Sequence, residues 1–276
     1  MTINCRGTLI DLSEPKVMGI LNLTPDSFYD GGKYKNESAI LNQAEKMLEE
    51  GTTFIDLGAY SSRPGANHVP EEEEKQRILP VLELLLRHFP NAFFSIDTFR
   101  SSVAHACLDM GAAIINDISA GNLDPKMFDV ISEFQVPYIL MHLKGTPQSM
   151  QGKAIYDNVI SDLLQYFAEK IDHAHSKKIN DIIIDPGFGF AKTLEQNYHV
   201  LAHLDLFQTL NKPILIGLSR KSMIYKTLKS SAAEALNGSS VLHSVALLKG
   251  AHILRVHDVK EAMECITLLQ TLKHNA

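Results

Sequence analysis

The chain has 276 residues, of which 45% are hydrophobic and 21% are charged, a balance that is ordinary for a globular protein. Its formal net charge of -6 gives no reason to expect nucleic acid as a partner, because binding along a phosphate backbone requires a basic face. No stretch approaches the roughly 20 apolar residues that a membrane-spanning helix requires, so a membrane protein is not expected.

The cysteines and the first residues indicate the compartment. Cys5, Cys107 and Cys265 are far apart in the sequence and form no CxxC pair, so neither a disulfide framework nor a zinc site is expected. Between Met1 and Leu12 no long apolar run follows a basic segment, as it would in a secretory signal. We therefore expect a cytoplasmic protein.

Eight short apolar runs recur along the chain, separated by longer stretches. They are nearly continuously apolar, a pattern typical of strands that are buried on both faces of a parallel sheet. In chain order the runs are Val17–Leu21, Thr53–Leu57, Ala92–Ile96, Ala112–Ile115, Pro137–Met141, Asp181–Ile184, Pro213–Leu218 and Ala251–Val256.

Amphipathic stretches of helical length lie between the runs, and several carry signals for a helix end. Gly51, Gly111 and Gly250 each follow one of them, as a C-terminal glycine does, and Pro70 precedes another at a favoured early position. The expected helices are Glu37–Glu50, Glu71–His88, Ser101–Met110, Asp124–Phe134, Tyr156–Lys178, Leu194–Leu210, Ala235–Lys249 and Val259–Lys273.

The alternation of strands and helices indicates a parallel sheet. Eight such units in a chain near the roughly 250 residues typical of the fold favour a closed (β/α)8 or TIM barrel. An open doubly wound sheet is the main rival, but it would normally have fewer strands and a GxGxxG turn, and no such turn is present. No linker or low-complexity segment interrupts the chain. We expect one α/β domain, a TIM barrel over residues 1–276.

Polar side chains follow each apolar run, and in a barrel these positions meet at one mouth, where active sites are built. A single Asp after a strand is usually a turn former or a helix N-cap, and Asp97 and Asp117 taken alone fit that description. A lone His142 is more often a hydrogen-bonded core residue, so it is left out of the site. Turn formation does not explain the convergence of the whole set, which is Asn22, Asp97, Asn116, Asp185, Lys221, Arg255 and His257.

The spacing within this set indicates a ligand. Arg255 and His257 are two residues apart on a strand and therefore point to the same side, and Lys221 follows the preceding strand. The loops after strands seven and eight form the usual phosphate site of these barrels, and an arginine presents a forked pair of donors to phosphate oxygens. We expect a phosphorylated or diphosphorylated substrate. The acids Asp97 and Asp185, with Asn116, suit a ligand rich in ring N–H groups.

These residues resemble the motifs of the dihydropteroate synthase family over nearly the whole chain. MGILNLTPDSFYDGG at 18–32 resembles the first signature of that family, and IDLGAYSSRPGA at 55–66 resembles the second. Further matches are SIDT at 95–98, INDI at 115–118, DPGFGF at 185–190, SRKSMI at 219–224 and RVHD at 255–258. So many matches in order are very improbable by coincidence, whereas a lone SRKS would be weak.

The resemblance implies a transferase of folate biosynthesis. The expected reaction joins (7,8-dihydropterin-6-yl)methyl diphosphate to 4-aminobenzoate and gives 7,8-dihydropteroate and diphosphate. The resemblance also implies that Mg2+ accompanies the diphosphate, that the enzyme is a homodimer, and that sulfonamides compete with 4-aminobenzoate.

Residue roles follow from the matching motifs. The expected catalytic residues are Asp30, Arg63, Lys221, Arg255 and His257. The pterin is expected at Asp97, Asn116, Asp185 and Lys221, with Phe190 beside its ring. The diphosphate is expected at Asn22, Arg255 and His257, with Asn22 as the magnesium ligand. The 4-aminobenzoate is expected at Phe28, Ser62, Arg63, Pro64 and Ser222.

The chain departs from the family motif at one place, and two alternative functions are considered. Family members commonly have Gly-Glu-Ser-Thr-Arg-Pro where this chain has Ala59-Tyr60-Ser61-Ser62-Arg63-Pro64, so a phenol replaces an acid at Tyr60. A pterin-binding methyltransferase of similar fold would share the acids and the asparagine but has no need for the TPDSF and SRPGA loops or the RxH pair. A relative that has lost catalysis would have degraded loops, and here only Tyr60 is unusual.

Overall fold

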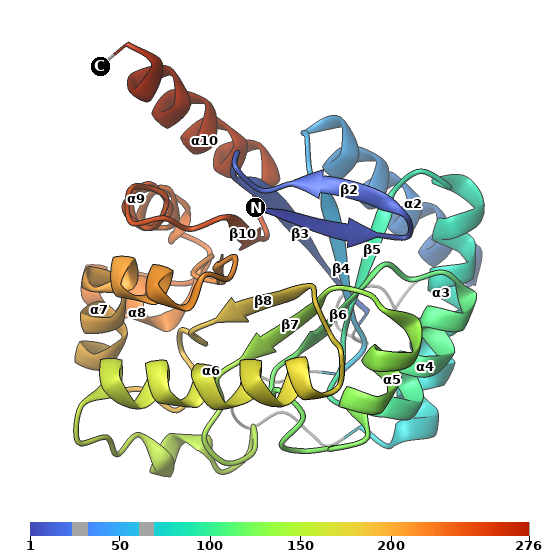
Figure 1. Cartoon of the computed structure of the whole chain (residues 1–276). Coiled ribbons are helices and arrows are strands. Elements are labelled where there is room, and N and C mark those ends of the chain that lie inside the picture. Colours follow the sequence, from blue (N-terminus) through green and yellow to red (C-terminus); the bar gives the residue numbers. More distant parts are fainter. Residues whose placement is uncertain (24–32, 61–68, 276) are drawn as a thin grey trace.

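The computed structural model describes residues 1–23, 33–60 and 69–275, apart from the side chains of residues 33–36 and Gln151. Eight parallel strands form a nearly closed barrel with helices between them (Figure 1). This is the TIM barrel that the sequence predicts. Over the described residues, we find no helix with both the length and the apolar character needed to cross a membrane.

The eight strands coincide with the eight predicted runs. Their order in the sheet is β8-β7-β6-β5-β4-β3-β10-β9. The gap between the two outer strands is closed by a single bridge from Ile184 to Ile214, next to a hydrogen bond from Ile184 N to Pro213 O of 2.9 Å. The strands are β3 (Lys16–Asn22), β4 (Phe54–Gly58), β5 (Phe93–Asp97), β6 (Ile114–Asp117), β7 (Tyr138–Met141), β8 (Ile182–Asp185), β9 (Leu215–Ile216) and β10 (Ile253–Val256).

The helices around the barrel also follow the prediction. They are α2 (Lys33–Glu49), α3 (Glu71–His88), α4 (Ser101–Met110), α5 (Met127–Phe134), α6 (Val159–Ser176), α7 (Leu194–Ala202), α9 (Leu236–Leu248) and α10 (Val259–His274).

Three features differ from the predicted helices. The stretch predicted as one helix from 194 to 210 is divided into α7 and a 3-10 helix, η3 (Leu204–Leu210). At the junction, His203 N is shared between His199 O and Val200 O, a bifurcated bond that often marks a helix end. Neither α8 (Ser222–Leu228) nor the 3-10 helix η2 (Met150–Lys153) was predicted, because each is too short for apolar periodicity to show it.

A hairpin that the sequence analysis did not identify closes the base of the barrel. β1 (Thr2–Cys5) and β2 (Thr8–Asp11) pair antiparallel, and both turn residues, Arg6 and Gly7, have positive φ, as a tight two-residue hairpin requires. Figure 1 shows the hairpin across the end where the strands begin. Its Ile3 and Cys5 form one buried cluster with residues near the strand starts, namely Met18, Phe54, Ile114, Ile139, Ile183, Leu215 and Ile253.

This apolar cluster forms the floor on which the site is built. Side chains two residues apart on a strand point to the same face, so the residue two positions beyond each floor residue also faces the barrel interior. On five of the eight strands that next residue is polar or charged. These residues are Asp56, Ser95, Asn116, Asp185 and Arg255, with Ser95 following Phe93, which packs against the floor.

The floor yields a prediction of stability. Phe54 is fully buried and its ring lies 6.3 Å from that of Phe93. We expect Phe54→Ala to lower the free energy of unfolding by about 3–5 kcal/mol, because it removes apolar contacts and leaves a cavity. Urea unfolding measures the loss. Ile155→Ala, on a side chain that is 74% exposed, is the control and is expected to change stability by less than about 0.5 kcal/mol. Equal effects of the two changes would show that the floor contributes no special stability.

Candidate active site

The centre of the site is Arg255, which is shared between two carboxylates. Arg255 lies on β10, and its Nε donates to Asp56 Oδ2 at 2.6 Å while its Nη2 donates to Asp97 Oδ2 at 2.7 Å. Asp56 is fully buried, whereas the side chain of Asp97 is 17% exposed. The guanidinium therefore joins three strands of the barrel interior, with one carboxylate on the floor side and one nearer the mouth.

Asn116 belongs to the same group. Its Nδ2 donates to Asp56 Oδ2 at 3.0 Å, so the oxygen of Asp56 that holds Arg255 also holds Asn116. On β8, Asp185 Oδ1 accepts from the backbone N–H of Gly187 at 2.7 Å. The structure thus brings four of the predicted residues, Asp97, Asn116, Asp185 and Arg255, into one interior.

Burial and the neighbouring opposite charges shift the pKa values of these residues in opposite directions. Burial raises the pKa of Asp97 to about 7 against the opposing effect of Arg255, and burial raises the pKa of Asp185 against that of Lys221. Burial lowers the pKa of Lys221 to about 8, and Asp185 opposes that change. For Arg255, burial lowers the pKa, but Asp56 and Asp97 more than compensate and raise it. The guanidinium therefore stays charged across the physiological range.

The loops after β9 and β10 are fastened to each other. Arg220 donates from Nε and Nη2 to the two carboxylate oxygens of Asp258, both at 2.8 Å. Ser219 Oγ accepts from His257 N at 3.2 Å and lies 3.1 Å from His257 Nδ1. Lys221 follows directly, and Ser222 begins α8. The loops that hold Lys221 and His257 therefore have a fixed relative position, as a phosphate site needs.

The loop after β8 carries Phe190 and is held by lysines. Lys221 Nζ donates to Phe188 O and lies 4.6 Å from the centre of the Phe190 ring. Behind the loop, the buried Nζ of Lys192 donates to Gly187 O at 3.1 Å and to Phe190 O at 3.2 Å. Phe190 is thus placed next to Lys221.

Lys192 and His142 are residues that the site prediction did not include. Lys192 Nζ lies 3.1 Å from His142 Nδ1. Burial lowers the pKa of His142 to about 2, so the ring is neutral and its Nδ1 accepts from the ammonium group. Burial also lowers the pKa of Lys192, to about 7. His142 is therefore the hydrogen-bonded core residue that the sequence analysis expects, and a lysine directly after DPGFGFA was the signal available for its partner.

Asp56 was also missed, although the sequence offers a signal for it. It is a charged residue inside the apolar run predicted as Thr53–Leu57, and buried charges are retained where they are paired. In the structure it bonds Arg255 and Asn116, two residues that the prediction did include.

Tyr60, the departure from the family pattern, has its own contacts. Its hydroxyl accepts from Gln148 Nε2 at 2.9 Å. Its ring packs edge-on against Phe99 at 5.1 Å, and the guanidinium of Arg100 lies 5.4 Å from its centre. The phenol is buried and joins the loops after three strands, which gives the substitution a packing role.

Of the remaining predicted residues, only Asn22 lies within the described part of the chain. Asn22 is the last residue of β3 and lies beside Gly58. A Cβ atom added at Gly58 would lie 3.7 Å from Asn22 Oδ1 and 3.7 Å from Asp97 Oδ2. Within residues 1–23, 33–60 and 69–275, no group of three or more His, Cys, Asp and Glu side chains is suited to hold a metal ion. The predicted residues Phe28, Asp30, Ser62, Arg63 and Pro64 lie outside the described residues.

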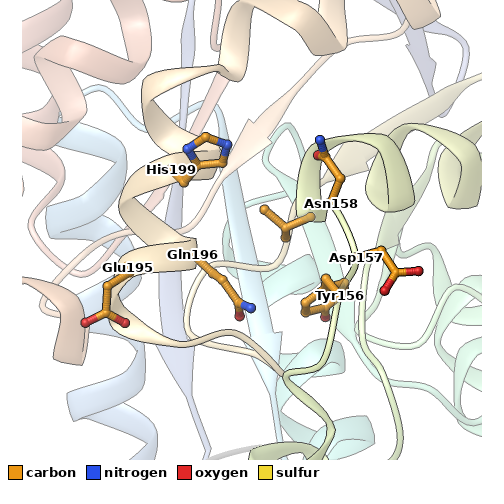
Figure 2. A pocket seen from close by; sticks show the side chains of 7 residues that line it. Tyr156, Asp157, Asn158, Glu195, Gln196 and His199 are labelled. Carbon is orange, nitrogen blue, oxygen red and sulfur yellow. The ribbon is translucent and has the colours of Figure 1, made fainter.

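A surface hollow of about 460 Å3 lies outside the predicted set (Figure 2). It is formed where α6 and α7 begin, and Tyr156 connects it to the loop after β8 by donating from its hydroxyl to Ala191 O at 2.7 Å. Its lining residues are Tyr156, Asp157, Asn158, Val159, Glu195, Gln196 and His199.

The chain is similar to known proteins in both sequence and fold. The model of the pterin binding enzyme family matches residues 18–257. The dihydropteroate synthase of Escherichia coli K12 is 42% identical over 98% of this chain and 96% of its own length. A crystal structure of Yersinia pestis dihydropteroate synthase with a sulfonamide drug has a TM-score of 0.92 and 39% identity, with all of both chains covered. The Xanthomonas albilineans enzyme in complex with 7,8-dihydropteroate has a TM-score of 0.88 and 35% identity, with 99% of both chains covered.

A TIM barrel with polar side chains converging at the carboxyl ends of its strands is the architecture of an enzyme. The chain belongs to the pterin-binding enzyme family and, within it, to the dihydropteroate synthases. It is therefore a transferase of folate synthesis.

The hydrogen bonds by which Lys192 clamps the loop after β8 from behind yield a prediction. We expect Lys192→Met to weaken binding of a pterin about tenfold, because the carbonyls of Gly187 and Phe190 lose a donor and an unsatisfied buried group costs roughly 1–3 kcal/mol. Titration calorimetry with a pterin measures the change. Lys144→Met is the matched control, since Lys144 is exposed and donates to Ile155 O on the same side of the barrel. Unchanged pterin affinity in the Lys192 variant would show that the clamp does not position the loop.

Proposed function

We propose that this chain condenses (7,8-dihydropterin-6-yl)methyl diphosphate with 4-aminobenzoate to give 7,8-dihydropteroate and diphosphate. The observation that carries the proposal is the polar interior built around Arg255 and Lys221, in a chain of the dihydropteroate synthase family. Acids and an amide suit the donor-rich edge of a pterin, and the cations beside them suit a diphosphate.

The pterin is proposed to bind against the floor of the barrel. Asp185, with one carboxylate oxygen already bonded to Gly187 N, accepts from the amino group and the adjacent ring N–H. Asn116 and Asp97 bind the other polar atoms of the ring, and Lys221 donates to the ring oxygen. Phe190 packs beside the ring, and the contact of Lys221 Nζ with the Phe190 ring supports this placement.

The diphosphate is proposed to bind at Arg255 and His257, with Asn22 on the other side. Asn22 offers a carbonyl oxygen, which is a hard ligand of the kind that Mg2+ prefers, and this ion is usually held by one or two protein ligands together with substrate phosphates. The residue therefore fits a magnesium ion that arrives with the diphosphate. When bound, the ion would neutralise charge on the departing group.

The 4-aminobenzoate is proposed to bind where Ser222 begins α8, beside Lys221. The other residues proposed for this substrate, by resemblance to the family, are Phe28, Ser62, Arg63 and Pro64.

For this reaction the protein must stabilise the departing diphosphate anion and hold the amine in line with the bond that breaks. The bond between the pterin methylene and the diphosphate oxygen breaks, and its electron pair leaves with the diphosphate. The amine nitrogen donates its lone pair to the methylene carbon and then loses a proton. Arg255 and His257 stabilise the departing charge, and Asp30 is proposed to stabilise the cationic methylene. An aromatic amine is weakly basic, so we assign no general base.

Three further properties are proposed from the described residues. Large apolar side chains on α8, α9 and α10 are more than half exposed, namely Leu228, Val241, Leu248, Leu268 and Leu272, and α10 extends beyond the rest of the fold (Figure 1). A monomer would leave this apolar surface in water, which supports a homodimer. The three free buried cysteines support the cytoplasm as the compartment. The eight-stranded barrel, with helices between its strands, supports one domain over residues 1–276.

An assay for diphosphate release tests the function directly. The enzyme is expected to release diphosphate only when both the pterin diphosphate and 4-aminobenzoate are present, and to form dihydropteroate in equal amount. Transfer of methyl from methyltetrahydrofolate would instead identify the pterin-binding methyltransferase. Pterin binding without release of diphosphate would identify a relative that has lost catalysis.

The role of Asp185 yields a prediction. Asp185→Asn is expected to weaken pterin binding by about 2–5 kcal/mol, because the amide replaces one acceptor with a donor that faces the donors of the ring. Calorimetry with a pterin lacking phosphate isolates this contact from the diphosphate site. Near-normal affinity would exclude Asp185 as the residue that binds the ring.

The shifted pKa values yield a second prediction. Asp97 must be ionised to accept from the ring, and its raised pKa of about 7 means that pterin capture weakens as the pH falls below 7. Lys221 must be protonated to donate, and its lowered pKa of about 8 means that capture weakens as the pH rises above 8. We expect kcat/KM for the pterin diphosphate to be bell-shaped, since this ratio reports groups of the free enzyme. Asp97→Asn is expected to remove the acidic limb, and a flat profile from pH 6 to 9 would contradict both assignments.

A further inference from the structure

The buried carboxylate of Asp56 lies below the predicted substrate residues and touches two of them. Its Oδ2 accepts from Arg255 Nε at 2.6 Å and from Asn116 Nδ2 at 3.0 Å. Arg255 is proposed to serve the diphosphate and Asn116 the pterin, so one oxygen atom connects the residues of the two halves of one substrate. We propose that Asp56 is a positioning residue of this enzyme, which orients Arg255 and Asn116 for that substrate. The inference rests on the proposed function.

Burial excludes direct contact of Asp56 with a ligand in the structure as described. The side chain has no exposed surface, so its influence on a substrate passes through its two hydrogen-bonded partners. Burying a carboxylate is costly unless it is paired and hydrogen-bonded, and the geometry supplies both a cation and an amide donor. Replacing the acid would leave the guanidinium with less compensation, which is more damaging than the loss of a surface charge.

The two carboxylates around Arg255 are not equivalent. Asp97 is partly exposed and is itself proposed to accept from the pterin ring, so its bond to Arg255 Nη2 competes with the substrate. Asp56 has no such competitor and can keep the Nε bond while Asp97 exchanges partners. Nη1 of Arg255 has no hydrogen bond to any described residue, so it is a donor that remains for phosphate oxygens. A guanidinium is planar and rigid, so fixing Nε also fixes the direction of the other donors.

Because the second oxygen of Asp56 makes no hydrogen bond to any described residue, a substitution can remove the charge of the side chain while keeping its size and shape. Within the described part of the chain, Asp56 Oδ1 and the buried Ser95 Oγ have no hydrogen-bond partner. An asparagine at position 56 would therefore keep an acceptor oxygen toward Arg255 and Asn116 and place its amide nitrogen where Oδ1 lies. Asp56→Asn changes the charge and little else, and Ser95→Ala removes a buried polar atom on the paired strand without touching Arg255 or Asn116.

The experiment compares Asp56→Asn and Ser95→Ala with the wild-type enzyme in three measurements: thermal unfolding, the affinity for diphosphate with Mg2+, and kcat and KM for the pterin diphosphate. The loss of a charge-assisted hydrogen bond corresponds to about a 10- to 100-fold change in an equilibrium constant. We expect Asp56→Asn to weaken diphosphate binding and to lower kcat/KM by about that factor at a temperature at which thermal unfolding shows both variants to be fully folded. Ser95→Ala is expected to keep wild-type kinetics.

The outcomes separate the inference from the proposed function. A wild-type enzyme that releases no diphosphate overturns the function itself. An active wild type, with an Asp56→Asn variant that melts earlier but binds diphosphate and turns over normally, overturns the positioning role and leaves a structural one.

A measurement on the wild-type protein covers a variant that fails to fold. The Arg255 Nε–H resonance, assigned by its disappearance in Arg255→Lys, is expected to keep its chemical shift and its slow exchange when diphosphate and Mg2+ are added, because Asp56 retains that bond. A large shift of this resonance on binding would show that Asp56 releases Arg255, and would overturn the proposal.

Discussion

The arrangement of the site depends on a guanidinium held between two carboxylates inside a barrel. Arg255 would be costly to bury alone, and Asp56 and Asp97 would be costly to bury without it, because a charge removed from water needs a partner close at hand. Each of the three comes from a different strand, so the ion pairs also tie β10 to β4 and β5 across the interior. Burial raises the pKa of Asp97 and lowers that of Lys221 against the effect of the opposite charges beside them, which leaves a carboxylate and an ammonium group that titrate close to neutral pH.

That charge cluster is possible because the layer beneath it is apolar and closed. The floor residues and the hairpin β1–β2 shut out solvent at the end where the strands begin, so the polar residues two positions further on are reached only from the mouth. Low polarity around the cluster strengthens each hydrogen bond within it and raises the cost of losing one. Lys192 and Lys221, behind and beside the loop after β8, donate hydrogen bonds of the same kind to the backbone carbonyls of that loop.

Much of this could be predicted from the sequence, and the failures have physical causes. Continuous apolar runs mark strands buried on both faces, which is why all eight were found, whereas β1 and β2 are short, half-exposed and held by the barrel rather than by their own pattern. The convergence of Asp97, Asn116, Asp185 and Arg255 follows from strand-end positions alone. Asp56 and Lys192 were missed because their importance lies in contacts between distant segments, and spacing along a chain carries no information on such contacts. The residues expected to receive 4-aminobenzoate, other than Ser222, lie outside the described residues, so their placement remains a prediction.

The hairpin at the base has a practical consequence for the use of this enzyme. It places Met1, which is half exposed, at the end of the barrel opposite the mouth (Figure 1). An affinity handle or a surface anchor attached ahead of Thr2 would therefore orient every molecule with its substrate entrance facing the solution. Attachment after α10 would instead crowd the exposed leucines of that helix, so the two ends of the chain are not interchangeable as points of immobilisation.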